Sequence, residues 1–228
     1  MVSRDAEMTV ERDFTPALGN ARFTPFYDLA IRLLTREHVW RDTLIQQINV
    51  SASDRILDVG CGTGSLAIRL QGIEPAAEVI GLDPDAEVLA RAQRKARRTG
   101  INIEWWHGFL TDEMVAQIAP VSKVVSSLVF HQTSLDEKAN LLSAMHSVLA
   151  PLGTLHIADY GLQKTKLMRV MFRRTVQMID GIEDTQPNAD GVLPDLIKAA
   201  GFTDLHETRV IATATGSISV YGAKKDEC

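Results

Sequence analysis

The sequence has few cysteines, few aromatic residues and no long apolar run. Its 228 residues contain two cysteines, Cys61 and Cys228, which excludes a disulfide framework and a cysteine-based zinc cluster. No stretch approaches the roughly 18 uninterrupted apolar residues of a membrane-spanning helix. Residues 1–13 are charged and lack the apolar segment of a signal peptide. We therefore expect a reduced, cytoplasmic protein without a metal site.

Basic residues are outnumbered by acidic ones. The chain has 24 Lys and Arg against 29 Asp and Glu, a net charge of −5, and a pI near 5.7. A nucleic-acid footprint is normally basic, so we expect no nucleic-acid partner. The 45% hydrophobic content of a chain of this length is enough for one sizeable core.

Strand-like and helix-like patterns alternate from residue 55 onward. The patterns predict strands at 55–59, 78–82, 102–106, 123–128 and 154–159, and helices at 65–71, 84–99, 135–149, 164–182 and 193–200. Two final strands, 204–213 and 217–222, are joined by a turn that only antiparallel strands can use. The fold class is therefore α/β: a doubly wound, mostly parallel seven-stranded sheet with a C-terminal antiparallel hairpin. A ligand is expected at the carboxyl ends of the early strands.

The expected domain organisation is simple. Residues 1–24 form a flexible N-terminal segment, and residues 25–228 form a single domain. Within that domain, apolar residues at helical spacing predict an N-terminal helical lid at 25–50. The helical pattern after the fifth strand predicts an inserted cap at about 162–190.

A glycine-rich turn follows the first strand and carries the sharpest signal. Gly60, Gly62 and Gly64 have the spacing G-x-G-x-G, whereas dinucleotide sites use G-x-G-x-x-G around a pyrophosphate. Asp58 precedes the turn, and an acid suits a ligand with cations, such as the ammonium and sulfonium of S-adenosylmethionine. Alternatively, Asp58 only holds the loop by hydrogen bonds. Asp83 ends the second strand, where it either binds ribose hydroxyls, caps a helix that starts at Pro84, or does both.

Six segments in order resemble the motifs of class I S-adenosylmethionine-dependent methyltransferases. They are 58–64, 81–85, 125–131, 148–159, 200–202 and 216–223. Over about residues 25–224 the chain is similar to the ubiquinone/menaquinone-biosynthesis type. It departs from the usual pattern at Phe130-His131-Gln132, where Phe-His-His is common, and at Phe109, where the adenine-contacting loop usually has an acid.

The resemblance implies an enzyme that transfers a methyl group from S-adenosylmethionine, with S-adenosylhomocysteine as product. The acceptor would be small, apolar, and ring-bearing or lipid-like. The implied cofactor-binding positions are Asp58, Gly60, Cys61, Gly62, Gly64, Asp83, Pro84, Gly108, Phe109 and Ser126. Phe109 would pack against adenine, or else belong to the core. A non-catalytic cofactor-binding module and, ranked lower, a nucleic-acid methyltransferase remain alternatives.

Three residues are candidates for the reacting end. His131 follows the fourth strand and is expected to face the methyl group as a general base, unless it only caps or binds a backbone carbonyl. Asp159 ends the fifth strand and either lines the pocket or caps a loop. Tyr27 either packs over the cofactor or substrate from the lid or is an ordinary surface aromatic.

Residues 164–182 combine apolar and basic side chains at helical spacing. Such a helix shapes an apolar acceptor pocket, lies on an anionic membrane as a peripheral contact, or simply has a solvated face over a core face. The sequence leaves these three interpretations open. It also leaves the oligomeric state open.

Overall fold

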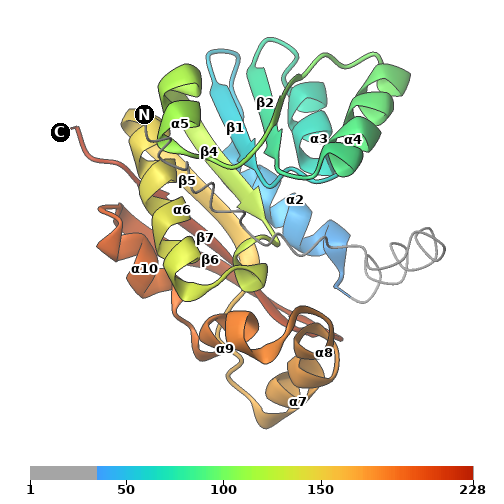
Figure 1. The fold of residues 1–228 in the computed structure, drawn as a ribbon, viewed down its shortest axis with the longest axis vertical. Coiled ribbons are helices and arrows are strands. Elements are labelled where there is room, and N and C mark those ends of the chain that lie inside the picture. The colour runs from blue at the N-terminus through green and yellow to red at the C-terminus, as the bar shows by residue number, and fades with distance from the viewer. Residues whose placement is uncertain (1–34, 228) are drawn as a thin grey trace, which may run out of the picture.

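Seven strands form one mixed sheet in the computed structural model, which describes residues 35–227. The strand order is β3-β2-β1-β4-β5-β7-β6 (Figure 1). Pairs from β3 to β5 are parallel, and β7 is antiparallel to both β5 and β6. The chain reverses its direction across the sheet beside β1, and ligands bind at such a switch point. The doubly wound sheet and its C-terminal hairpin agree with the sequence-based expectation.

The strands lie close to their predicted positions. They are β1 (Arg55–Val59), β2 (Glu78–Asp83), β3 (Glu104–His107), β4 (Val121–Ser127), β5 (Leu149–Tyr160), β6 (Thr203–Thr213) and β7 (Gly216–Lys224). The helices are α2 (Glu37–Ile48), α3 (Ser65–Ile73), α4 (Ala86–Thr99), α5 (Asp112–Ile118), the short 3₁₀ helix η1 (Phe130–Gln132), α6 (Leu135–Val148), α7 (Lys166–Arg174), α8 (Val176–Asp180), α9 (Ile182–Asp190) and α10 (Leu193–Ala199).

The sheet buries both faces, because successive side chains of its strands enter opposite cores. Ile56 packs in the core that includes residues of α2, α3, α4 and α7, whereas its neighbour Leu57 packs with residues of α5, α6 and α10. Val79 and Ile80 of β2 divide in the same way. This two-sided burial explains why the central strands are continuous apolar runs.

The start of α4 differs from the expectation. The cap is Asp85, whose carboxylate accepts hydrogen bonds from the backbone N–H groups of Glu87 and Val88. The prediction that Asp83 caps this helix, with Pro84 in its first position, was wrong. Asp83 belongs to β2, and two further residues are needed to turn the chain into the helix. The predicted stop at Gly100 is confirmed by its left-handed φ of 70°.

The predicted and observed structures differ most in the helices that connect the strands. The predicted helix over 164–182 is divided at Thr175 into α7 and α8, and α9 follows after Gly181, whose φ is 85°. Neither α9, which is largely polar and contains Pro187, nor the seven-residue α5 has enough apolar periodicity to be predicted. Of the segment 25–50, which is predicted to be a helical lid, residues 35–50 are described and contain α2, whereas residues 25–34 and the segment 1–24 lie outside the described residues.

In the described part of the chain, no helix combines the length and the apolarity that crossing a membrane requires.

Candidate active site

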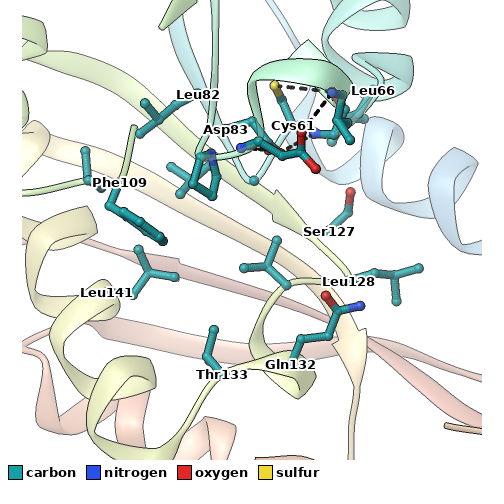
Figure 2. Close-up of a pocket in the computed structure, with 18 of the residues that line it drawn as sticks. Cys61, Leu66, Leu82, Asp83, Phe109, Ser127, Leu128, Gln132, Thr133 and Leu141 are labelled. Carbon is teal, nitrogen blue, oxygen red and sulfur yellow. Dashed lines mark hydrogen bonds between the residues drawn. The ribbon is translucent and has the colours of Figure 1, made fainter. Parts of the chain in front are cut away.

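A cavity of about 470 Å³ opens at the carboxyl ends of β1, β2 and β4. Its first side is formed by the glycine turn, the end of β2 and the loop after β3. Its second side is formed by residues that follow β4 and by α6 and α9. Figure 2 shows Asp83 and Cys61 on the first side and Gln132 and Thr133 on the second. The volume is in the range of small-molecule sites.

The three glycines of the turn do different work. All have left-handed φ values, 70° for Gly60, 55° for Gly62 and 70° for Gly64. A Cβ atom on Gly62 would meet nothing within 4 Å, so this backbone is open to a ligand in the cavity. A Cβ on Gly60 would lie 2.3 Å from Val129, and one on Gly64 would lie 2.5 Å from Trp105. Gly64 does not line the cavity, so glycine is required at this position by the left-handed backbone and by the close packing of Trp105.

Asp83 lies at the cavity wall with a carboxylate that is already oriented. One oxygen accepts from the Gly62 N–H at 2.8 Å, and the other accepts from the Asp85 N–H at 2.9 Å. Burial raises the pKa of Asp83, and these two hydrogen bonds lower it. Each oxygen keeps a second lone pair for a hydroxyl donor. The position, cavity access and remaining lone pairs fit a diol ligand such as ribose.

Asp58 is fully buried behind the turn and does not line the cavity. Neither carboxylate oxygen has a hydrogen-bond partner of normal geometry among the described residues. Burial raises the pKa of Asp58 to about 7, the Arg41 guanidinium lowers it, and the nearby Asp83 raises it. A buried carboxyl with open acceptor capacity fits a water-mediated rather than a direct contact with a cationic ligand. The backbone N–H of Ala67, at the start of α3, also lowers the pKa of Asp58 as a hydrogen-bond donor, so the loop-holding role stands beside the cofactor role.

The remaining predicted cofactor positions divide into two groups. Cys61, Pro84, Gly108 and Phe109 line the cavity, and Phe109 is 42% exposed rather than packed in the core. Ser126 does not line it. Its hydroxyl donates to the carbonyl of Val59 at 2.9 Å, and Ser127 faces the cavity instead. Ser126 was therefore the wrong choice of the two serines. Because β4 is buried on both faces of the sheet, its sequence has no apolar–polar alternation that would indicate which serine faces the cavity.

His131 and Asp159 also lie away from the cavity wall. His131 is 3% exposed, and its Nδ1 lies 2.8 Å from Asp159 Oδ1. Asp159 also accepts from the backbone N–H groups of Phe130 and Tyr160, both at 2.7 Å. The structure therefore does not place His131 or Asp159 at the cavity wall, where the sequence analysis expected them. A fully buried carboxylate needs donors, and it draws the imidazole inward.

The pair has a third member that the sequence did not indicate. Asp180, at the end of α8, places Oδ2 3.7 Å from His131 Nε2. Burial raises the pKa of Asp180, His131 lowers it, and Asp159 raises it. His131 therefore links β5 to the cap helices. Its neighbours Gln132 and Thr133 in the same loop reach the cavity (Figure 2).

Several cavity residues were missed by the sequence reading. They are Trp40, Arg41, Gln132, Thr133, Glu137, Leu141 and Asp184. Gln132 and Thr133 directly follow a recognised motif, which was the available signal. No sequence signal pointed to Asp184, because it lies on α9, far along the chain from the other residues of the cavity wall. Tyr27, the predicted lid residue, lies outside the described residues.

Comparison with known proteins agrees with this geometry. Residues 56–153 match the model of a methyltransferase domain. The chain is 31% identical over 192 residues to a demethylmenaquinone methyltransferase of Thermus thermophilus, covering 78% of this chain and 83% of that protein. It is 31% identical over 124 residues to a ubiquinone/menaquinone biosynthesis C-methyltransferase of Bdellovibrio bacteriovorus, covering 54% of this chain and 52% of that protein.

Solved structures support the fold. A magnesium protoporphyrin IX methyltransferase of Synechocystis with bound S-adenosylhomocysteine superposes with a TM-score of 0.65 at 18% identity, covering 88% of each chain. The sheet order, the open backbone at Gly62 and the acid ending β2 define a class I S-adenosylmethionine-dependent methyltransferase. Within that class, the chain belongs to the family of ubiquinone/menaquinone-biosynthesis methyltransferases.

Proposed function

We propose that this enzyme methylates a small, apolar, ring-bearing acceptor of the quinone type with lipid-like character. The observation that carries the proposal is the second side of the cavity, where Leu128, Val129 and Leu141 add an apolar wall beside Gln132 and Thr133. Apolar walls with a few polar groups are typical of sites for such molecules. The names of the relatives support the same class, since they act in menaquinone and ubiquinone biosynthesis.

We assign the cofactor to the first side of the cavity. Asp83 would accept hydrogen bonds from the ribose hydroxyls, Gly62 would let the backbone approach the methionyl part, and Phe109 would pack against the adenine. Asp58 would act through water on the cationic end. S-adenosylmethionine supplies a methyl group on a positively charged sulfur, so the residues of this chain mainly orient the acceptor in line and exclude water.

We assign His131 a positioning role in place of the general-base role. Its imidazole joins Asp159 to Asp180 and so holds η1 against β5. Gln132 and Thr133 would then present their polar groups to the acceptor at a fixed depth. Asp184 of α9 and Glu137 of α6 make this end acidic, which favours an acceptor that donates hydrogen bonds, such as a ring hydroxyl.

We also propose how the domain is divided around the site. The segment 25–50 acts as a lid, supported by Trp40 and Arg41 of α2 at the cavity wall. The segment 162–190 acts as the cap on the acceptor side, supported by Asp184 at the same wall.

The test is release of S-adenosylhomocysteine with short-tailed hydroquinones and naphthoquinols as acceptors, with the methylated ring identified by mass spectrometry. We expect turnover with such rings and little with nucleic acid. His131→Asn should lower kcat and leave cofactor affinity unchanged, because Asp83 and Gly62 are intact. If the variant binds cofactor and turns over like the wild type, the positioning role is wrong. Cofactor binding without methylation of any ring acceptor would overturn the proposed substrate class.

A further inference from the structure

The outer surface of the cap carries an unusual concentration of exposed apolar side chains. Leu167 and Val170 of α7, Met178 and Ile179 of α8, and Ile182 at the start of α9 are all exposed, with Leu167 at 70% and Met178 at 75%. We call these five residues the apolar tip. The three helices pack in sequence, α7 on α8 and α8 on α9. Figure 1 shows them together at one end of the molecule.

The tip is outside the core because α7 is anchored by its opposite face. Phe172 is 1% exposed and packs against Tyr160, with ring centroids 5.1 Å apart. Leu167, Val170 and Arg174 are three and four residues apart, so they share the other face of the helix. Burial among the described residues therefore does not explain the apolar character of this face.

Basic residues accompany the tip in a protein that is acidic overall. Every charged residue from 164 to 179 is a cation: Lys164, Lys166, Arg169, Arg173 and Arg174. The acids Asp180, Glu183 and Asp184 flank Ile182, so the basic character belongs to α7 and the segment before it. Within residues 35–227, the side chains of Lys164, Lys166, Arg173 and Arg174 form no hydrogen bond or ion pair, whereas Arg169 bonds to Gln163 and Asp190. By contrast, Arg55, Arg69 and Lys123 are each paired with an acid.

We propose that the apolar tip and its four cations, which have no partner within residues 35–227, dock this enzyme on an anionic phospholipid bilayer. The apolar side chains enter the boundary between headgroups and acyl chains, and the cations pair with headgroup phosphates. Although the chain has a net charge of −5, a symmetric contact with a second copy would place the same basic face against itself. An anionic bilayer has the complementary charge, so charge complementarity selects the bilayer as the partner.

The docked orientation has a consequence for the acceptor. Asp184 of α9 lines the acceptor side of the cavity, two residues after Ile182 of the tip. Docking therefore brings the acceptor side close to the lipid that would hold a long-tailed acceptor. This consequence rests on the proposed function, whereas docking itself does not.

The test is flotation of the full chain with vesicles of phosphatidylcholine, alone or mixed with phosphatidylglycerol. We expect binding to the mixed vesicles that weakens with salt, and little binding to phosphatidylcholine. The variant Lys166→Gln/Arg173→Gln/Arg174→Gln should bind roughly 100-fold more weakly, at about fivefold for each cation removed. The matched control is Arg94→Gln/Arg97→Gln/Arg98→Gln on α4, which has no exposed large apolar residue, and it should bind like the wild type.

A second pair of variants tests the apolar contribution. Leu167→Ser/Met178→Ser/Ile179→Ser should lose the binding that persists at high salt, whereas Ile73→Ser/Leu152→Ser, exposed elsewhere, should keep it. Equal binding to both vesicle types, or an equal loss in the α4 control, would overturn the proposal. So would a dimer in sedimentation experiments that the tip substitutions dissociate. Turnover with a dispersed short-tailed acceptor separates the two ideas, because it tests the proposed function without vesicles.

Discussion

At the scale of single residues, the two acids of the first cavity side have different environments and should have different effects. Asp83 touches the cavity and holds Gly62 and Asp85 through its two oxygens. Asp83→Ala should weaken S-adenosylmethionine binding tenfold or more, about 1.4 kcal/mol. Calorimetry measures this directly. Thr165→Ala, which removes the cap of α7 and lies outside the cavity wall, controls for lost stability. Unchanged affinity in Asp83→Ala would exclude the ribose contact.

Asp58 should make cofactor binding depend on pH. Its folded pKa, about 7, lies above the ordinary 3.8, so the folded protein prefers the protonated form. Stability of the ligand-free protein should therefore fall as pH rises from about 4 to about 7. A cationic ligand favours the ionised form, so its affinity should rise over the same range, by at most about tenfold per pH unit, and level off above pH 7.

The isosteric variant Asp58→Asn separates this effect from titration of the ligand's own amine. Both proteins experience the ligand's titration, but only the wild type has the carboxyl group. The difference between their calorimetric affinities across pH 5.5 to 7.5 should therefore follow Asp58 alone, in the window below about 7. Identical pH profiles would show that Asp58 stays in one protonation state.

At the scale of elements, one buried lysine connects α9 to the loop after η1. Lys138 of α6 is fully buried, and its Nζ donates to the carbonyls of Thr133 and, at 2.9 Å, Asp184. Both carbonyls belong to residues of the cavity wall. Lys138→Met should lower the free energy of unfolding by about 2 kcal/mol, because two partly buried carbonyl acceptors lose their donor. Hydrogen exchange should increase most in α9, and the KM for the acceptor should rise.

Lys225 offers a matched control for that variant. Its Nζ also donates to two backbone carbonyls, those of His146 and Leu149, at 2.8 and 2.7 Å. Neither residue lines the cavity. Lys225→Met should therefore change stability without changing the KM for the acceptor. Equal effects of the two variants on KM would mean that Lys138 acts only through overall stability.

At the scale of the whole molecule, the proposed function depends on the two sides of the cavity, which are built in different ways. The cofactor side is built from consecutive strand–loop–helix units, β1 to β3, whose loops all emerge at one sheet edge. The proposed acceptor side combines η1 and α6, which are neighbours in the chain, with the more distant α9. The first arrangement is set by the general geometry of parallel sheets, and the second depends on how α9 packs beside η1 and α6.

The sequence by itself determined the sheet, the glycine turn and the acid at the end of β2. These features depend on local signals: apolar runs of strand length, left-handed glycines, and an acid a fixed distance along the chain. Such signals place Gly62 and Asp83 without knowledge of distant contacts. The predicted strands accordingly match the observed ones to within a few residues, apart from the start of β5, which the structure extends back to Leu149.

Only the tertiary structure decided which polar side chains face the cavity. Ser127 rather than Ser126 faces it because packing on both sides of β4 sets the orientation of each residue. His131 turns inward because Asp159, 28 residues later, is buried and needs donors. Asp184 reaches the wall because Lys138 ties α9 to the loop after η1. Each outcome follows from long-range burial and pairing, which the order of residues along the chain does not reveal.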